Sequence, residues 1–339
     1  MKRILTSALL LFILVPAWPR ADAQLLPNLG GQRVGISAFQ FLKLGADARG
    51  VAMGEASVAV ANDASSLYWN PAGMVQSDDN QVIASHTEYV ADIRHEFLGI
   101  VYHVTGQDAL GLSCVALHME DMEVTTETQP FGTGRYFSFG DVAVGLSYAR
   151  KMTDQFSFGA TVRYVNETLD VLAMRAFMFD LGTFYWTGLG SLRFAVVISN
   201  FGGDVAPEGS VTQENGTVVS SFQSFSVPTV FKIGIAFEPL HVENHRLTGS
   251  FQLNHPNDNS EHVRLGVEYA WNETVFARAG LKRTIRQTVL GDDQTTAESY
   301  SAGLGVRGDV GFSRVGADYS YSAFSRLGAV HRFSFTFTF

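Results

Sequence analysis

Hydrophobic and polar residues alternate strictly at the C-terminus of the chain. Every second residue from position 333 onward is aromatic (Phe333, Phe335, Phe337 and Phe339), and the residues between them are Ser or Thr. A period of two predicts a β-strand, because successive side chains of a strand point to opposite faces. An aromatic outer face and a polar inner face are typical of a membrane barrel. The alternative is a Phe-rich edge strand buried in a β-sandwich.

The same alternation recurs along the chain from Asn80 onward and predicts about fourteen strands. In the strand 156–168, for example, Phe158 and Val162 share one face, whereas Thr161 and Arg163 lie on the other. The lengths suit tilted membrane strands, so the predicted fold class is all-β, a transmembrane antiparallel β-barrel. The predicted strands are 81–90, 97–104, 109–119, 137–152, 156–168, 176–186, 192–200, 229–237, 246–253, 263–271, 274–282, 299–306, 314–321 and 330–339.

Two of these strands carry charged residues at positions that face the predicted lumen. Lys232 lies at an inward position of 229–237, and Arg264 and Glu268 lie at inward positions of 263–271. The outward residues of the two strands are Phe231, Ile233, Ile235, Phe237, Val263, Leu265, Val267 and Tyr269.

The connections between the predicted strands alternate in length. The longest are 120–136, 201–228 and 283–298, and all three follow odd-numbered strands. With a periplasmic N-terminus, odd strands run outward, so every long loop faces the cell exterior and both termini are periplasmic. The short turns are 106–107, 153–154, 187–188, 272–273 and 309–311, with a somewhat longer one at 239–245.

Residues 24–76 lack the strand pattern and predict a compact plug with short helical turns. Small residues are dense here, which allows close approach of backbones. The segment ends in the turn Asn70-Pro71-Ala72-Gly73, preceded by Tyr68 and Trp69. Pro71 fixes φ and Gly73 can take a positive φ, which together redirect the chain.

The N-terminus predicts export. Lys2 and Arg3 precede an apolar stretch, 4–15, that is too short for a comfortable membrane span, and Ala21-Asp22-Ala23 gives a small-x-small cleavage pattern. The alternative is a retained N-terminal anchor. The expected organisation is therefore a signal peptide at 1–23, a plug at 24–76 and a barrel at 77–339.

Composition agrees with a barrel and excludes some partners. Hydrophobic residues make up 46% of the chain and charged residues only 17%, below the usual quarter, so much of the surface is not expected to face water. A net charge of −9 without basic clusters argues against nucleic-acid binding. The single cysteine, Cys114, excludes an intrachain disulfide and lies in a strand pattern, packed or facing lipid.

The stretch "GADARGVAMGEASVAVANDASSLYWNPAGM", within residues 39–74, resembles the N-terminal signature of the PorV/PorQ family of outer-membrane proteins. That family is related to FadL-type channels, which carry a similar "NPA" turn after a plug. The resemblance implies an outer-membrane component of the type IX secretion system that binds or shuttles cargo at the cell surface. Its implied partners are the secretion translocon and cargo signal domains, with loops 120–136 and 201–228 as candidate recognition surfaces.

A second function follows from the relation to FadL. It is a transporter of long-chain fatty acids or other hydrophobic small molecules, with residues 45–73 as the gate and Tyr68 and Trp69 as lining groups. The alternative for these two aromatics is packing of the plug against the wall. The terminal Phe333 to Phe339 pattern also resembles a barrel assembly signal, which implies the barrel-assembly machinery and outer-membrane lipid as partners.

Other motifs do not indicate catalysis, a cofactor or a metal. Residues 303–308 match G-x-G-x-x-G but lie in and after a strand with no helix following, so lumen-facing small residues explain them better. The tripeptide 307–309 (Arg-Gly-Asp) falls at a predicted turn. The nine histidines have no metal-binding spacing, and no nucleophile elbow is present. The loop acids Glu120, Asp121, Glu123, Asp292 and Asp293 could bind Ca²⁺ or bridging ions, but solvation is the simpler interpretation.

Overall fold

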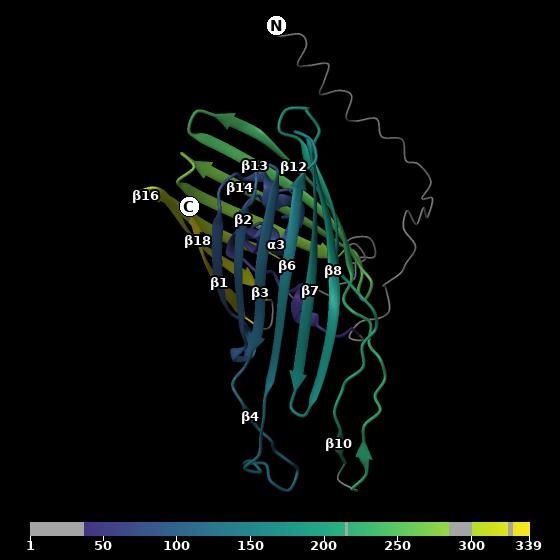
Figure 1. Ribbon diagram of the computed structural model, residues 1–339. Helices are drawn as coiled ribbons and strands as arrows, with labels where there is room; N and C mark the ends of the chain where they lie inside the picture. The colour runs from purple at the N-terminus through teal and green to yellow at the C-terminus, as the bar shows by residue number, and fades with distance from the viewer. Residues whose placement is uncertain (1–36, 214–215, 285–299, 325–327) are drawn as a thin grey trace, which may run out of the picture.

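The protein is a closed antiparallel β-barrel in which every strand pairs with its neighbours along the chain (Figure 1). The computed structural model describes residues 37–213, 216–284, 300–324 and 328–339. The fourteen predicted strands are confirmed as barrel strands, with small differences at their ends. They are β1 (Gln81–Glu88), β2 (Arg94–His103), β3 (Asp108–His118), β6 (Phe139–Lys151), β7 (Phe156–Leu169), β8 (Leu172–Trp186), β9 (Arg193–Phe201), β12 (Val230–Val242), β13 (His245–Pro256), β14 (His262–Trp271), β15 (Val275–Thr284), β16 (Tyr300–Val310), β17 (Ser313–Ala323) and β18 (Ala329–Thr338).

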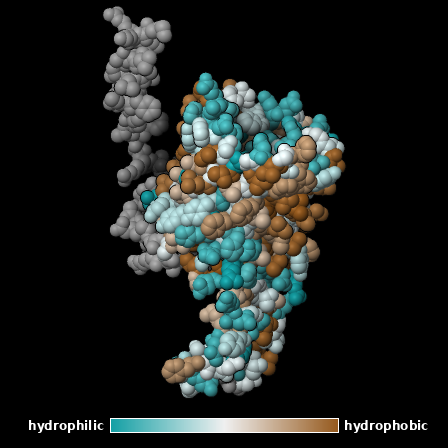
Figure 2. Space-filling model, turned by 90° about the vertical axis from the view of Figure 1, so that its left-hand side faces the viewer, coloured by the Kyte–Doolittle hydropathy of each residue, from teal (hydrophilic) through white to brown (hydrophobic). Residues whose placement is uncertain are grey.

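The terminal strand β18 closes the ring by pairing with β1, from Gln81 opposite Thr338 to Glu88 opposite His331. Phe333 and Phe335 on its outer face are 44% and 60% exposed, whereas Arg332 and Ser334 on its inner face are buried. The same in-out alternation runs through β7, β12 and β14, as the sequence predicts. Figure 2 shows hydrophobic side chains gathered over the middle of the barrel surface and hydrophilic ones toward its ends.

The two ends of the barrel differ. Loop 120–136 contains the hairpin strands β4 (Met122–Glu123) and β5 (Tyr136–Phe137), and loop 201–228 contains β10 (Val211–Thr212) and β11 (Val218–Val219). Both loops project from the same end, at the bottom of Figure 1, as their parity predicts. We call this the long-loop end and the opposite one the short-turn end. The third predicted loop, 283–298, lies almost entirely outside the described residues.

Two predicted turns at the short-turn end are partly strand. Strand β12 continues through Pro239 to Val242 with a register shift between Phe237 and Leu240, so the expected turn 239–245 is shorter than predicted. Strand β16 likewise extends to Val310, which places the Arg-Gly-Asp tripeptide in the strand rather than in the turn. Pairing with a neighbouring strand extended both hairpins past residues that usually mark turns.

Residues 37–76 lie inside the barrel, and we call them the plug segment (Figure 1). They form η1 (Gln40–Lys43), α2 (Ala48–Ala52), α3 (Ser66–Trp69) and η2 (Pro71–Gln76), while a further turn, η3 (Val90–Asp92), follows β1. Asp47 caps α2 by accepting from the Gly50 backbone N–H, and Asn70 caps η2 by accepting from that of Ala72. Among the residues that the structure describes, every helix is too short or too polar to cross a membrane.

Candidate functional site

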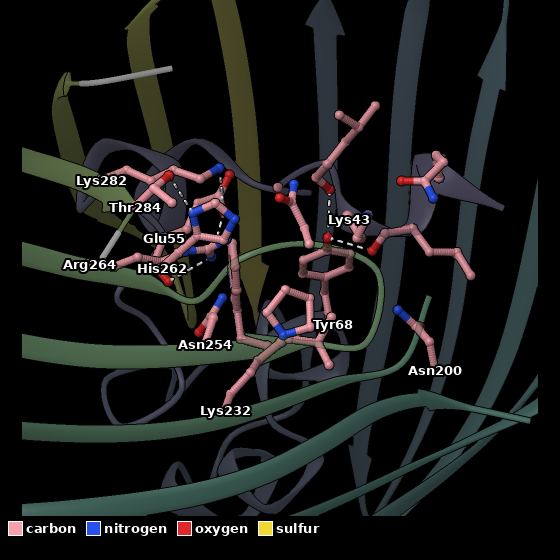
Figure 3. Close-up of a pocket in the computed structure, with 18 of the residues that line it drawn as sticks. Lys43, Glu55, Tyr68, Asn200, Lys232, Asn254, His262, Arg264, Lys282 and Thr284 are labelled. Atoms are coloured by element: carbon pink, nitrogen blue, oxygen red, sulfur yellow. Dashed lines mark hydrogen bonds and ion pairs between the residues drawn. The ribbon is translucent and has the colours of Figure 1, made fainter. Parts of the chain in front are cut away.

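A cavity of about 470 Å³ lies inside the barrel, toward the long-loop end (Figure 3). Its lining from the plug segment includes Lys43, Glu55 and Tyr68. Its wall comes from the ends of strands β9, β12, β13, β14, β15 and β18 nearest the long loops. The plug segment and the strand ends nearest the long loops together line this cavity.

The predicted turn at Asn70 packs against glycines of the wall. The Asn70 amide nitrogen donates to the backbone carbonyls of Val58 (2.9 Å) and Thr183 (3.1 Å). A side chain at Gly182 would overlap Asn70, and one at Gly159 would overlap the backbone of Pro71 and Ala72. The turn therefore joins the plug segment to β7 by close backbone approach and to β8 through the Asn70 side chain.

Gly73 serves a different purpose from the one the sequence predicts. Its φ is not positive, so conformational freedom does not explain the glycine. A Cβ at this position would overlap the backbone carbonyl oxygen of Ala61. Lack of space inside the plug segment, rather than a left-handed turn, requires glycine here.

Tyr68 and Trp69 both border the cavity, and both are also fixed within the plug segment. The Tyr68 hydroxyl donates to the carbonyls of Leu42 (3.0 Å) and Leu44 (2.6 Å), and the Trp69 indole N–H donates to Asp47 (2.5 Å). Their rings meet edge to face with centroids 4.8 Å apart. Their side chains therefore border the cavity and hold together the inside of the plug segment.

Buried ion pairs fasten the plug segment to the wall. Arg49 of α2 pairs with Glu268 of β14 (3.0 Å) and with Asp63 (2.7 Å). Glu268 also pairs with Arg278 of β15 (2.7 Å), which in turn pairs with Asp318 of β17 (2.5 Å). We call these five residues the Glu268 cluster. Because each charge has a buried partner of opposite sign, breaking one pair leaves the other charge unsatisfied.

Glycines allow the plug segment to pack closely against the strands that the Glu268 cluster joins it to. Gly54, at φ +64°, lies against β14 and β15, where a Cβ on Gly266 would be 2.5 Å from the Met53 carbonyl oxygen. A Cβ on Gly280 would overlap the Gly54 backbone nitrogen. In β16, Gly303 and Gly305 of the G-x-G-x-x-G match face inward against Ala52 and the Arg278–Asp318 pair. This confirms that the match reflects small lumen-facing residues.

At the rim of the cavity, Asp258 holds η1 in place. It accepts from the Gln40 amide (2.9 Å) and pairs with Lys43 (2.8 Å). Burial raises the pKa of the Asp258 carboxyl, but the hydrogen bonds from Gln40 and Lys43 outweigh it, so that the pKa lies below its usual range. Asp258 therefore stays ionised and keeps the start of the plug segment anchored.

Asp47 of the plug segment has a pKa that is shifted in the opposite direction, upward. Burial, together with the neighbouring Asp63 carboxylate, raises the pKa of Asp47 to about 6. Hydrogen bonds from Gly50 and Trp69 oppose this shift without cancelling it. The inside of the plug segment therefore contains a carboxyl group that titrates between acidic and neutral pH.

The candidate recognition loops are connected to the barrel and to the plug segment. In loop 120–136, the Thr133 backbone N–H donates to the Val124 carbonyl (2.9 Å), and the Val124 N–H donates to the carbonyl of Arg135 (2.8 Å). The Arg135 side chain pairs with Asp170 between β7 and β8. In loop 201–228, Glu208 bridges to Ala173, and the Ala38 backbone N–H donates to the carbonyl of Ser226 (3.0 Å). Loop 201–228 is therefore hydrogen-bonded directly to the plug segment.

The other sequence candidates remain separate from this cavity. Glu120 pairs with Arg94 (3.5 Å) and Glu123 accepts from the Gly134 N–H, whereas Asp292 and Asp293 lie outside the described residues. Within the described ranges, no cluster of three or more His, Cys, Asp or Glu residues could hold a metal ion. Cys114 is half-buried in β3.

The sequence placed Lys232, Arg264 and Glu268 on inward faces but gave them no role. Charged residues at lumen-facing positions of otherwise apolar strands are the signal that could have found them. Their partners come from distant parts of the chain, which the strand pattern does not reveal.

Comparisons with known proteins agree on the architecture. The Pseudomonas putida toluene transporter TodX is similar at 14% identity, with 87% of this chain and 97% of that chain covered and a TM-score of 0.58. The Ralstonia pickettii toluene transporter TbuX (13%, 87% and 97%, TM-score 0.55) and a Pseudomonas aeruginosa FadL homologue (14%, 87% and 98%, TM-score 0.54) are also similar. Such identities show the fold alone, a FadL-like outer-membrane barrel. No curated protein sequence matches the chain.

A family model gives the more specific finding. The model described as type IX secretion system protein PorV matches residues 28–256. The match spans the described plug segment and the barrel strands through β13, and it includes the stretch whose resemblance the sequence shows. Because it covers more than half of the chain, the protein belongs to the PorV family of type IX secretion system proteins.

Proposed function

We propose that this protein binds secreted cargo at the outer surface of the outer membrane and presents it to the type IX secretion machinery. The observation that carries the proposal is the PorV family match over residues 28–256. In this proposal the signal peptide 1–23 is removed, residues 24–76 form the plug and 77–339 the barrel. Both termini are periplasmic, and the long-loop end faces the cell exterior. The outward apolar side chains contact lipid, and the barrel-assembly machinery inserts the chain.

Loop 120–136 supplies a surface suited to a protein contact. Its tip exposes Phe131 almost completely (98%), flanked along the loop by exposed Met122 and Tyr136. The hairpin is held by backbone hydrogen bonds and by the Arg135–Asp170 pair, so the aromatic side chain is presented on an ordered support. Exposed aromatic residues of this kind commonly dominate the binding energy of protein interfaces. No catalytic residue or cofactor is part of the proposal.

Deletion of the gene tests the secretion role. We expect cargo that carries a type IX signal domain to accumulate in the periplasm and to leave the cell surface. Unchanged surface cargo in the deletion strain would refute the proposal.

Complementation then tests the loop. Phe131→Asp should restore the barrel to the outer membrane but not restore cargo secretion, because a charge replaces the exposed apolar contact. The matched control is Phe312→Asp, which changes an equally exposed phenylalanine at the short-turn end. If both variants secrete normally, recognition does not use this loop.

A further inference from the structure

The cavity is lined by more positive than negative charge. Lys43, Lys232, Arg264, Lys282 and Arg332 border it, and Glu55 is the single carboxylate among the described lining residues. Glu55 pairs with Arg264 (2.5 Å) and contacts Lys282 (3.5 Å), and Lys43 pairs with Asp258 just outside the lining. Lys232 and Arg332 are the two remaining cationic side chains of the described lining.

Lys232 is largely buried in the barrel and forms no ion pair with a described residue, while the carboxylates of Asp180 and Glu55 act on it only from beyond ion-pair distance. Its side chain lies on the inner face of β12 and is only 8% exposed. Neither a hydrogen bond nor an ion pair joins its ammonium group to any residue that the structure describes. A largely buried ammonium group that lines a cavity and has no hydrogen-bonded partner favours a ligand of opposite charge there.

Arg332 on β18 is incompletely satisfied in the same cavity. Its Nε donates to the Thr87 hydroxyl at 2.8 Å, but its Nη1 is buried and has no hydrogen-bond partner among the described residues. Two cationic groups, Lys232 on β12 and Arg332 on β18, therefore border one cavity, although the unpartnered Nη1 of Arg332 is itself enclosed by protein. The guanidinium fork and the lysine point charge are complementary ligands for the oxygens of a phosphate group.

The remaining lining indicates a hydrophilic ligand. Asn200, Asn254 and Asn259 offer neutral amide groups around the cationic side chains, and Figure 3 shows Asn254 beside Arg264 and His262, with Asn200 across the cavity. Their amide oxygens already accept hydrogen bonds from Arg163, Gln252 and the Ser260 backbone N–H, but a polar lining of this kind suits hydroxyl or carbonyl groups better than a long alkyl chain. The volume of about 470 Å³ exceeds that of a bare anion and accommodates a small organic solute.

We propose that this cavity binds a small hydrophilic phosphate compound, with Lys232 as its principal cationic ligand and Arg332 adding positive charge to the wall of the same cavity. The site is separate from the Phe131 loop tip. It stands whether or not the protein carries cargo, since it rests on the lining of the cavity alone.

Calorimetric titration of the purified full chain in detergent tests the site. Inorganic phosphate and glycerol phosphate are the probes, at neutral pH, with sodium chloride adjusted to keep ionic strength constant because surface charge effects are screened by salt. We expect saturable binding of both probes and an increase in the thermal unfolding temperature. Lys232→Met should weaken binding about tenfold, the effect of losing one charge-assisted hydrogen bond.

The control variant is Lys151→Met, which removes the same charge from the end of β6, away from the cavity. It should leave the affinity unchanged. Lys232→Arg keeps the charge and should retain measurable binding, so a folding failure of Lys232→Met does not leave the question open. Absence of saturable phosphate binding to the wild-type protein would overturn the proposal. Equal weakening by both methionine variants would also overturn it, as would binding of decanoate without binding of phosphate.

Discussion

At the scale of single residues, glycine marks where the plug segment touches the wall. Gly159 and Gly182 face the turn at Asn70, and Gly266 and Gly280 face Met53 and Gly54. Gly159, Gly266 and Gly280 let two backbones come closer than any side chain would permit, and Gly182 leaves room for the Asn70 side chain. The abundance of glycine in the sequence, which fits any barrel, therefore has a more specific cause at these four positions.

Gly280→Ala should destabilise the folded protein by about 1–3 kcal/mol, because the added methyl group overlaps the Gly54 backbone nitrogen and the plug segment must move. Thermal unfolding in detergent, followed by the heat-dependent change in gel mobility, measures the effect. Gly308→Ala in β16 is the control, since a Cβ there meets nothing within 4 Å. Equal stability of the two variants would contradict the close contact.

The raised pKa of Asp47 predicts that the stability of the folded protein depends on pH. Its pKa is about 6 in the folded protein, against 3.8 for an ordinary aspartate. Between these values the unfolded chain releases the proton while the folded chain keeps it, so the contribution of Asp47 to stability is fully present below pH 3.8 and is lost as pH rises through 6. The loss amounts to about 3 kcal/mol.

Asp47→Asn cannot ionise and should escape this loss. Its stability relative to wild type should increase as pH rises from 4 to 6 and then remain constant. Thermal unfolding of both proteins across this range provides the measurement. A stability difference that does not change with pH would show that Asp47 is already ionised at pH 4.

At the scale of elements, the strands were predictable because their signal is local. The alternation in β7, β12, β14 and β18 is set by which face of each strand meets the lumen, and a few consecutive residues suffice to read it. The contacts of the plug segment are different. Arg49 and Glu268 are 219 positions apart, so no local pattern could pair them. The unpaired Lys232 likewise becomes visible only when β12 and β18 border one cavity.

A charge on the outer face of the terminal strand β18 is expected to destabilise the barrel. Phe335→Lys places a charge on the outward face that we propose contacts lipid, and this should destabilise the barrel by about 2–4 kcal/mol. Less folded protein should then reach the outer membrane, measured by membrane fractionation and gel mobility. Leu189→Lys, in an exposed turn, should have no such effect. Normal levels of the Phe335 variant would argue that this face is not in the hydrocarbon region.

At the scale of the whole molecule, the plug segment is joined to the wall around much of the ring. The Asn70 turn meets β7 and β8, the Glu268 cluster reaches β14, β15 and β17, and Ala38 bonds to loop 201–228. A channel that opens through the plug segment would have to break these buried charge pairs. A surface carrier of cargo needs no such movement. The two functions therefore differ in whether the plug segment must leave its place.

A disulfide that fixes the plug segment to the wall tests whether the plug segment must move for function. A Cβ on Gly234 of β12 would lie 3.5 Å from the Cβ of Ala59, within the range of a disulfide, although it would overlap the Val58 side chain. The variant Ala59→Cys, Gly234→Cys, Val58→Ala and Cys114→Ser should therefore crosslink under oxidising conditions. We expect the oxidised protein to support cargo secretion as well as the same variant kept reduced, because the long-loop end is unchanged. If oxidation abolishes secretion and reduction restores it, the plug segment has to move for function, and a model in which cargo binds only at the surface is wrong.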